Sequence, residues 1–490
     1  MAPLTTVLAL LSLLGGHVAH SDSDFVTVGA NHLHFQAGDS SFVPIGLNIA
    51  WPDKHSGTST EDYYEEYFSD LSASGGNVAR VWLGPNLVDS FNPLALLRHN
   101  YTTVDPAAAG LVDSLVASAE KHSVKLLLTF DSFNGLCPSF ASGNCKWGDS
   151  VYNSANGGPL NSQVGYLAFW TDATAKKAFK ALLKFASDRW GGSSAVFAWE
   201  LFNEVDLAGY DLPFGFYDWH EEMAGYLRKV DGGRHLITES FGLVAGNKFV
   251  DGSDSFDFTS THNYARTSRG PQSPNVAKSN AGWSKDKTNW YKKPSIVGEF
   301  GCDDTVPDAD ANFRHTLHAG LWSPIFRGGA GTGLSWFWAG EAMDDDFERE
   351  WFLAEFRSYS KFVGVVGAEL GARPLGDVPF EELSVHVLES SGASEGGEEL
   401  DAFGIVGEAG AVSLIWLHDA KDTCGSDTPT RSFEGVQIWL KNIPDGDWKV
   451  TWFDTETGAS TEETVGSVGG LTITAPSFVQ DIAIVVSPII

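Results

Sequence analysis

Two short apolar segments of this chain end in carboxylic acids. One reads Phe197-Ala-Trp-Glu-Leu-Phe-Asn203-Glu204, and the other reads Ser295-Ile-Val-Gly-Glu299-Phe-Gly. Both have the continuous apolar character of strands that are buried on two faces. Two carboxyl groups brought to one place can cleave a glycosidic bond, because one protonates the leaving oxygen and the other attacks the sugar or activates water. Glu204 and Glu299 are therefore candidate catalytic residues.

Polar side chains follow other apolar segments, at positions that would surround the two acids. Arg80 lies inside such a segment, where an arginine has to be paired, and we expect it to hold Glu299 ionised through charge-assisted hydrogen bonds. Tyr264 is expected to donate to the same carboxyl group, and His262 to lie against the other acid. Asn203 would bond the 2-hydroxyl of a bound sugar, a contact that strengthens in the transition state.

Aromatic and acidic residues complete the predicted site. Trp338, or Trp336, would form an apolar floor under the reacting sugar. Asp131 follows the third apolar segment, and Trp147 lies in the long loop after it, where it could form a wall of a binding cleft. Residues 266–290 are a second candidate wall. Each residue has a structural alternative, such as a loop cap or a buried ion pair, but their order along the chain favours one shared site.

The rest of the chain supplies elements that could position these residues. Eight short apolar segments, most followed by a longer amphipathic one, predict parallel strands joined by helices. Eight such units make an α/β fold, the (β/α)8 TIM barrel, whose active sites lie at the carboxyl ends of the strands. The predicted strands are residues 44–51, 77–84, 125–133, 196–204, 235–241, 258–265, 294–301 and 333–340. The predicted helices include residues 61–74, 107–122, 172–190, 216–230 and 311–325.

The pattern changes beyond residue 366. Short apolar segments separated by turn-like sequences predict a smaller all-β sandwich. Its strands are expected at residues 411–417, 435–440, 448–453, 470–475 and 480–486. We therefore expect three parts: a signal peptide at residues 1–21, a catalytic barrel at 22–368 and a β-sandwich domain at 369–490.

Composition narrows the class of partner. There are 32 Lys and Arg against 63 Asp and Glu, and the resulting net charge of −31 argues against nucleic acid and anionic membranes. The first residues form an apolar run of signal-peptide length that is too short to span a bilayer. We expect a secreted monomer that binds a neutral glycan, with no metal and no cofactor. The 17 tryptophans suit stacking on sugars, although core packing accounts for most of them.

Four cysteines fit an oxidising compartment. Cys137 and Cys145 lie close together in a segment rich in glycine and serine, and we predict a disulfide between them. Cys302 and Cys424 could pair across the two domains, a question that the sequence alone leaves open. The cysteine spacings do not resemble those of a zinc site.

Taken together, the motifs resemble those of the clan A retaining glycoside hydrolases, especially the family 5 cellulases and β-mannanases. The resemblance covers roughly residues 25–365 and implies that Glu204 is the acid/base and Glu299 the nucleophile. It implies supporting roles for Arg80, Asn203, His262, Tyr264 and a tryptophan of the eighth strand. It also implies retaining hydrolysis of β-linked glycans without a metal, and the tail resembles β-sandwich domains appended to such barrels.

One departure and several alternatives stay open. Many family 5 members carry a histidine at the end of the third strand, where this chain has Asp131 between Phe130 and Ser132, so the subfamily is open. The expected activity is an endo-β-mannanase or endo-β-glucanase, but the same loops could close a pocket and give an exo-acting β-glycosidase or a transglycosylase. A non-catalytic carbohydrate-binding protein would keep the aromatic cleft and lose the chemistry. The β-sandwich could bind polysaccharide or support the barrel.

Overall fold

The computed structural model describes most of the chain from Asp24 onward. The segments outside the description are residues 1–23, 53–57, 85–91, 139–143, 209–213, 266–274, 303–312, 337–345, 372, 392–399, 425–429 and 490. The predicted signal peptide at 1–21 and the predicted floor residue Trp338 therefore lie outside the described residues.

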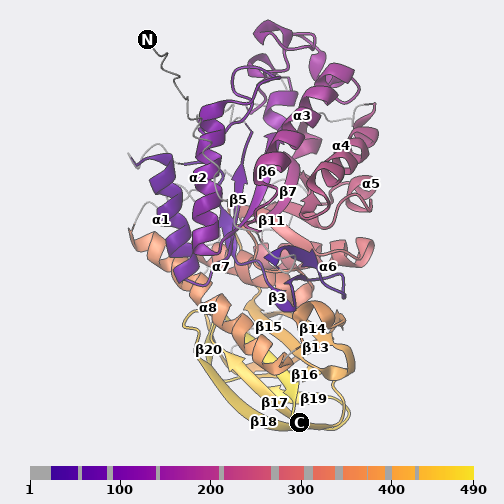
Figure 1. Cartoon of the computed structure of the whole chain (residues 1–490). Helices are drawn as coiled ribbons and strands as arrows, with labels where there is room; N and C mark the ends of the chain where they lie inside the picture. Colours follow the sequence, from indigo (N-terminus) through magenta and orange to yellow (C-terminus); the bar gives the residue numbers. More distant parts are fainter. Residues whose placement is uncertain are drawn as a thin grey trace, which may run out of the picture.

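Parallel strands lie among the helices in the first part of the chain (Figure 1), and their pairing arranges them in a ring. They are β4 (Gly46–Asn48), β5 (Val78–Trp82), β6 (Lys125–Ser132), β7 (Val196–Asn203), β8 (Leu236–Thr238), β9 (Ser240–Phe241), β10 (Thr259–Ala265) and β11 (Ser295–Cys302). Neighbours pair in parallel in chain order, and only Glu239 separates β8 from β9. Ser335 bridges both Leu47 and Phe300, which closes the ring where the eighth strand was predicted. The predicted α/β fold with a parallel sheet is confirmed.

Helices cover the outside of this ring. They are α1 (Thr60–Ala73), α2 (Pro106–His122), α3 (Ala173–Trp190), α4 (Phe216–Asp231), α5 (Lys248–Asp251), α6 (Val276–Tyr291), α7 (Phe313–Trp322) and α8 (Asp346–Leu370). The helices α1, α2 and α3 each begin at a capping side chain, since Ser59, Asp105 and Asp172 each accept a backbone N–H of the first turn. The helices predicted from the apolar periodicity agree closely with α1 to α4 and with α7.

The second predicted wall, at residues 266–290, forms a helix over most of its described length. Asn275 caps α6 by accepting the N–H of Lys278. The helix packs on the outside of the ring, where Asn280 accepts a 2.6 Å hydrogen bond from Asn263 of β10. Its sequence is largely polar, so the apolar periodicity that marks the other helices is weak here.

An N-terminal meander, which the sequence did not lead us to expect, covers the amino ends of the barrel strands. It consists of β1 (Val26–Val28), β2 (Phe35–Ala37) and β3 (Ser40–Phe42). The rings of Phe35 and Phe42 contact Phe197 of β7 at centroid distances of 5.1 and 5.5 Å, and Phe35 also contacts Phe258. These aromatic contacts fill the end of the barrel that is opposite the predicted site.

Two antiparallel sheets follow the barrel. One contains β12 (Phe380–Glu382), β14 (Leu400–Gly407), β15 (Ser413–Asp419), β21 (Asp481–Pro488), β17 (Gly446–Phe453) and β18 (Ser460–Ser467). The other contains β13 (Val385–Ser391), β16 (Ser432–Leu440), β19 (Leu471–Thr474) and β20 (Phe478–Val479). Ile415, Ile438 and Val450 belong to the core between them, as expected for a sandwich. The sequence patterns located β15, β16, β17, β19 and β21 and missed the other strands.

The outer face of the larger sheet shares its core with the barrel helices. The ring of Trp416 in β15 stacks on Phe326 at 5.8 Å, and Phe453 in β17 contacts Phe362 of α8 at 5.4 Å. These side chains belong to the same buried cluster as the barrel core. In Figure 1 the sheets accordingly lie directly below the barrel, with α8 running from one part to the other.

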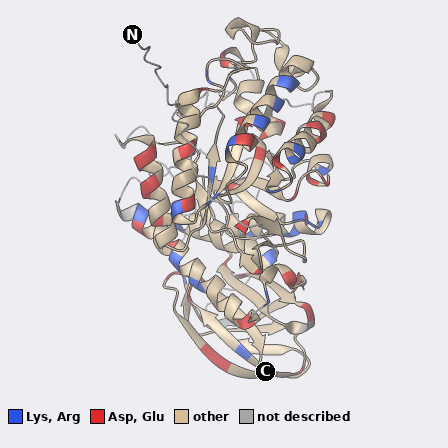
Figure 2. Ribbon diagram, viewed as in Figure 1, with Lys and Arg blue, Asp and Glu red and all other residues tan. Residues whose placement is uncertain are grey.

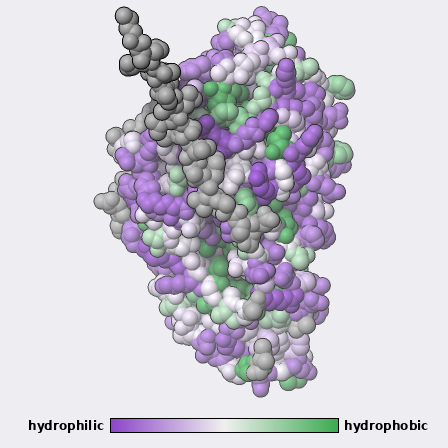
Figure 3. Space-filling view, in the orientation of Figure 1, coloured by the Kyte–Doolittle hydropathy of each residue, from purple (hydrophilic) through white to green (hydrophobic). Residues whose placement is uncertain are grey.

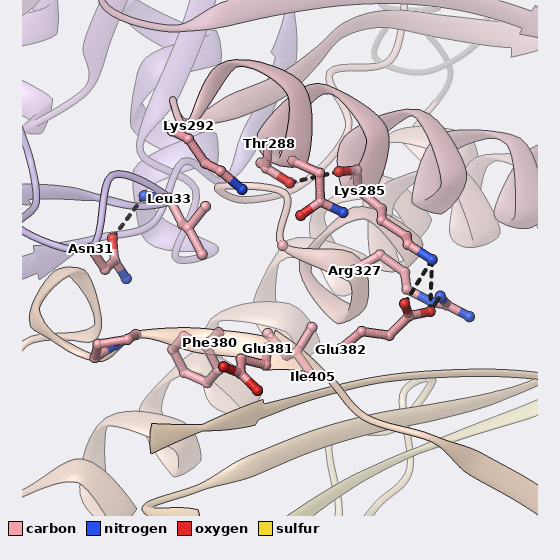
Figure 4. Close-up of a pocket in the computed structure, with 13 residues that line it drawn as sticks. Asn31, Leu33, Lys285, Thr288, Lys292, Arg327, Phe380, Glu381, Glu382 and Ile405 are labelled. Atoms are coloured by element: carbon pink, nitrogen blue, oxygen red, sulfur yellow. Dashed lines mark hydrogen bonds and ion pairs between the residues drawn. The ribbon is translucent and has the colours of Figure 1, made fainter. Parts of the chain in front are cut away.

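A pocket of about 200 Å³ marks the edge of this junction (Figure 4). Its walls come from the β1–β2 turn, from α6 and from β12, far from the carboxyl ends of the barrel strands. Lys285 of α6 and Arg327 both pair with Glu382 of β12 across it. The pocket is thus spanned by ion pairs that link the barrel to the sheets.

The surface carries the acidic excess of the chain. Acidic residues colour much of α1, whereas lysines gather along α3 (Figure 2). The face seen in Figure 3 is mostly hydrophilic, with apolar side chains in small separate patches. Among the described helices, none combines the length and the apolar character needed to cross a membrane.

Candidate active site

Arg80 is the centre of a buried hydrogen-bond network at the carboxyl ends of the strands. Its Nε and Nη2 donate to Glu200 of β7 at 2.7 and 2.9 Å. Its Nη1 donates to Glu299 at 2.7 Å and to Asn48 at 3.0 Å, and Nη2 also donates to Asn203 at 2.8 Å. All five N–H groups therefore have acceptors. Burial opposes the charge, but the two carboxylates raise the pKa of Arg80 above its ordinary value, so the group is a cation.

Glu200 is a site residue that the sequence analysis did not single out. It is fully buried, and its Oε2 also accepts a 2.7 Å hydrogen bond from Thr129 of β6. Burial alone would raise the pKa of Glu200, but the guanidinium of Arg80 lowers it, so this carboxyl group is ionised. The available signal was a glutamate inside an apolar strand, which has to be paired when it is buried.

Glu299 lies at the same depth as Arg80, in β11. Besides the bond from Arg80, its carboxylate accepts a 2.7 Å hydrogen bond from the Tyr264 hydroxyl, and His262 Nδ1 lies 3.4 Å from Oε2. The side chain is 4% exposed. Burial raises the pKa of Glu299, and the positive groups beside it, together with the Tyr264 hydroxyl, oppose that rise. The structure thus brings together the residues predicted around this acid.

A glycine makes room for this arrangement. The register between β10 and β11 shifts between Thr261 and His262, which leaves Gly298 without a partner residue and places Glu299 opposite His262. Irregularities of this kind turn side chains toward a site. A Cβ atom on Gly298 would lie 2.2 Å from Ser260 Oγ and 3.3 Å from His262 Nε2, so a side chain at this position would displace the groups that line the site.

Glu204 follows β7 in a strained backbone conformation. Its φ is 49°, a left-handed value that residues other than glycine adopt rarely. Its backbone N–H donates to Ser240 Oγ at 3.1 Å, and its Oε1 lies 3.1 Å from His262 Nδ1. The side chain is 15% exposed, so it is the more accessible of the two acids. Burial raises the pKa of Glu204 to about 7, which keeps the group largely protonated in mildly acidic solution.

His262 lies between the two acids. Its Nδ1 and one oxygen each of Glu204 and Glu299 lie within 4.8 Å of one another. A divalent cation could be held by three such atoms. Both carboxyl groups also have polar contacts within the protein, Glu204 with His262 Nδ1 and Glu299 with the Tyr264 hydroxyl.

Three tryptophans lie beside Arg80. Trp51, Trp82 and Trp336 contact one another at ring-centroid distances of 5.2 to 5.8 Å, and the guanidinium of Arg80 lies 5.7 Å from the Trp82 ring. Trp82 is buried, whereas Trp51 and Trp336 are half-buried. They form an apolar group on the β4–β5 side of the site, and Trp336 belongs to the predicted floor.

Two predicted residues lie apart from this cluster. Asp131 is buried, accepts the backbone N–H of Ser132 at 2.8 Å, and lines a small recess with Tyr152. Burial raises its pKa to about 7. Trp147 is buried inside the long loop and donates its indole N–H to the Ser162 carbonyl at 2.8 Å. Neither residue has a contact with Glu204 or Glu299 among the interactions of the described residues.

The predicted local disulfide is confirmed. Cys137 and Cys145 are bonded, with their Cα atoms 5.0 Å apart. Their bond and Trp147 stabilise the loop after β6 from within. Cys424 is buried and disulfide-bonded. The side chain of Cys302, its predicted partner, lies outside the described residues, so the identity of that partner stays a prediction.

Comparison with known sequences finds relatives that are named as mannan endo-1,4-beta-mannosidases. The chain is 31% identical over 212 residues to a probable mannan endo-1,4-beta-mannosidase A of Aspergillus oryzae, a match covering 41% of this chain and 49% of that protein. It is 28% identical over 240 residues to mannan endo-1,4-beta-mannosidase A of Aspergillus aculeatus, covering 46% and 56%. The chain thus spans about half the length of these relatives. No protein-family model matches the sequence.

Comparison with solved structures extends over nearly the whole chain. A glycoside hydrolase family 5 protein from Bacteroides vulgatus matches with a TM-score of 0.62 at 13% identity, over 95% of this chain and 93% of that one. The fold is that of a family 5 glycoside hydrolase. A second glycoside hydrolase matches with a TM-score of 0.61 over 95% of this chain and 97% of its own length. The family 5 resemblance inferred from the strand-end motifs is confirmed.

Proposed function

We propose that this chain is a secreted, endo-acting β-mannanase that cleaves its substrate with retention of configuration. The site contains paired carboxyl groups inside a family 5 fold, and the relatives of known or probable function are named as mannan endo-1,4-beta-mannosidases. The net charge of −31 suits a neutral polysaccharide better than an anionic one.

The spacing of the two acids carries this proposal. Both Glu204 and Glu299 contact the same nitrogen of His262, and carboxyl oxygens of the two lie within 4.8 Å of each other. Retaining glycosidases hold their carboxyl groups about 5–5.5 Å apart, whereas inverting enzymes need about 6.5–9.5 Å to admit a water molecule. The short spacing supports direct attack by one carboxylate on the sugar.

In the first step, Glu299 attacks the anomeric carbon, and the bond to the leaving oxygen breaks as Glu204 gives it a proton. The carboxylate of Glu299 is kept reactive by Arg80 and Tyr264, which stabilise its charge. Glu204 keeps its proton because burial raises its pKa to about 7. The product is a covalent ester between Glu299 and the sugar.

In the second step, Glu204 acts as a base. It removes a proton from a water molecule that attacks the anomeric carbon, and the ester to Glu299 breaks. Glu299 carries no negative charge while it is esterified, so the pKa of Glu204 falls. Glu204 can then serve as a base. Asn203, fixed by Arg80 Nη2, bonds the sugar 2-hydroxyl, and Trp336 supports the sugar from the β4–β5 side.

The remaining parts of the chain receive supporting roles in this proposal. Residues 1–21 direct secretion, residues 22–368 form the catalytic domain, and residues 369–490 form a β-sandwich that supports the barrel. The disulfide between Cys137 and Cys145 suits an extracellular protein.

The test is product analysis with wild type and Glu299→Gln on β-mannan, β-1,4-glucan, β-1,3-glucan, xylan and galactan. We expect wild type alone to release manno-oligosaccharides, with the β anomer formed first in the NMR spectrum. Release of one small sugar would make the enzyme exo-acting. Release of the α anomer first would overturn the retaining mechanism. Binding without any release would favour a non-catalytic carbohydrate-binding protein.

A further inference from the structure

Glu239 is a buried carboxylic acid that the proposed reaction does not use. It is the single residue between β8 and β9, directly beside the segment that ends in Asn203 and Glu204. Its side chain is 1% exposed, and its Oε1 accepts the backbone N–H of Phe202 at 3.0 Å. Burying a carboxyl group costs free energy unless hydrogen bonds or a charged partner offset the loss of water.

The contact to Phe202 replaces a missing part of the sheet. The pairing of β7 with β8 ends at Glu200 opposite Thr238. Beyond that point the side chain of Glu239 takes the N–H of Phe202, and the side chain of Ser240 takes the N–H of Glu204. These side-chain oxygens replace the backbone carbonyl acceptors that a neighbouring strand would supply. The chain can therefore leave the strand at Glu204, whose φ is a left-handed 49°.

The other oxygen of Glu239 faces a histidine. Glu239 Oε2 and His220 Nε2 of α4 are 3.4 Å apart, and each atom is buried with no other hydrogen-bond partner among the described residues. His220 Nδ1 lies 2.8 Å from the Phe216 carbonyl, so Nδ1 carries a proton and donates it there. Satisfying both facing atoms requires one proton between them. That proton belongs either to the carboxyl group or to the imidazole.

The surroundings favour the uncharged pair. Glu200 and Asp206 are the acidic groups that act on Glu239, and burial and then the charge of Glu200 raise the pKa of Glu239 well above its ordinary value. His220 is enclosed by aromatic rings, including those of Phe216 and Trp219, and burial lowers its pKa to about 4, although the nearby Glu221 favours the charged form. The cation Arg80 is neutralised by its own carboxylate partners.

We propose that Glu239 is a positioning residue that works as a neutral carboxylic acid. Its carbonyl oxygen accepts the N–H of Phe202, its hydroxyl donates to His220 Nε2, and the two bonds hold Glu204 in the orientation needed to protonate the leaving group. The inference rests on the proposed role of Glu204 as acid/base.

The conservative variant gives the first test. In Glu239→Gln the amide oxygen and the amide N–H reproduce the acceptor and the donor of the neutral acid, so kcat/KM on mannan and its pH profile should stay close to those of wild type. Glu239→Ala should lower kcat about 100-fold, the effect of misplacing a reacting group by about 1 Å, with little change in KM. Glu200→Gln is the matched control: it removes an ionised buried carboxylate on the neighbouring strand and should lose activity.

Two outcomes of this test would overturn the proposal. Equal damage by Glu239→Gln and Glu239→Ala would mean that the negative charge matters. A shift of the alkaline limb to lower pH in Glu239→Gln would mean that a charge next to Glu204 had been removed.

A second measurement needs no catalytic activity. We expect the NMR signals of His220, assigned with His220→Gln, to show a neutral ring with its proton on Nδ1 throughout the range of about pH 5 to 8 in wild type and in Glu239→Gln. A charged ring that becomes neutral in Glu239→Gln would show an ion pair and sink the inference. Because this readout is independent of turnover, an inactive protein with the expected His220 signals would contradict the proposed function alone.

Discussion

Two buried clusters of this molecule each place a cation between two carboxylates. At the mouth of the barrel, Arg80 lies between Glu200 and Glu299. Below the barrel, His318 of α7 lies between Glu355 of α8 and Asp481 of β21, with nitrogen–oxygen distances of 2.8 and 2.7 Å. The second cluster joins the barrel to the antiparallel sheets, and its cation is slightly more exposed, with the His318 side chain 13% exposed and that of Arg80 0%.

The two clusters differ in whether an additional acidic group lies beside the ion pairs. In the lower cluster, the oxygens of Glu355 and Asp481 are further satisfied by Trp322 and Thr455, and no additional acid contacts His318 among the described interactions. The upper cluster has an extra acid, Glu204, with a strained backbone and a raised pKa. The lower cluster, in which both acids are paired with the cation, contributes to stability. The additional acid of the upper cluster is a group that can transfer a proton.

The most severe way to break the upper cluster is Glu299→Gln. Loss of the proposed nucleophile should reduce kcat on mannan by roughly four or more orders of magnitude, the scale seen when a covalent nucleophile is removed. Binding of manno-oligosaccharides, measured by calorimetry, should persist because the aromatic groups are unchanged. Near-normal turnover would contradict the role given to Glu299.

Glu204→Ala should have the next largest effect. We expect a loss of about 10²- to 10⁴-fold on mannan and a smaller loss on an aryl glycoside with a good leaving group, which needs little protonation. Azide should restore the rate on the aryl glycoside by taking the place of the missing base and should form a β-glycosyl azide. The absence of this product in chromatography would count against the acid/base role.

Arg80→Met tests how much the upper cluster depends on its cation. Two buried carboxylates would lose their partner, so the free energy of unfolding should fall by about 3–5 kcal/mol. Arg349→Met is the control, because Arg349 pairs with the partly exposed Glu66 and Asp70, and its loss should change stability by about 1 kcal/mol or less. Urea unfolding of both variants gives the comparison, and equal losses would refute it.

The pH profile sharpens the distinction between the two acids. Since Glu204 must carry a proton and its pKa is raised to about 7, kcat/KM should fall about tenfold for each pH unit above that value. On the acidic side, activity should fall when Glu299 becomes protonated. The pH–rate profile of Glu204→Gln, measured on an activated aryl glycoside, should lack the alkaline limb. If the variant keeps that limb, the limb belongs to another group.

The lower cluster should respond to pH through stability instead of rate. Burial disfavours a charged His318, but Glu355 and Asp481 raise its pKa well above 6.5, so the folded protein holds a proton that the unfolded chain releases. This stabilisation is complete below about pH 6.5 and declines above it, by at most about 1.4 kcal/mol per pH unit, until the folded group titrates. Unfolding at several pH values should show this decline in wild type and in the exposed control His99→Gln, but not in His318→Gln.

The strand-end residues of the site were predictable because they break an apolar pattern. Arg80, His262 and Glu299 are polar residues in buried strands, and the barrel topology requires the carboxyl ends of those strands to meet. The role of Trp147 rests on a different argument, the length of the loop after β6; the structure shows its indole bonded to the Ser162 carbonyl within that loop, and its place in a cleft wall stays a prediction. The parallel strands were likewise located within a few residues.

Other parts of the site depend on geometry that sequence spacing does not encode. Glu239 belongs to an ordinary apolar strand pattern, and only the split between β8 and β9 reveals that its side chain serves Phe202. The register shift at Gly298 and the left-handed φ of Glu204 are backbone features that many sequences with the same pattern would lack. The helix α6 escaped prediction because its exposed and buried faces are both rich in polar residues.

The shared core between the barrel and the larger antiparallel sheet has a consequence for how the chain folds and how it can be divided. Because Phe326 and Phe362 pack directly on Trp416 and Phe453, cutting the chain after α8 would leave a broad aromatic surface in water. The barrel and the sheets should therefore melt as one cooperative unit, with a single calorimetric transition. The antiparallel sheets look like a separate domain in the sequence, but they contribute directly to the stability of the barrel.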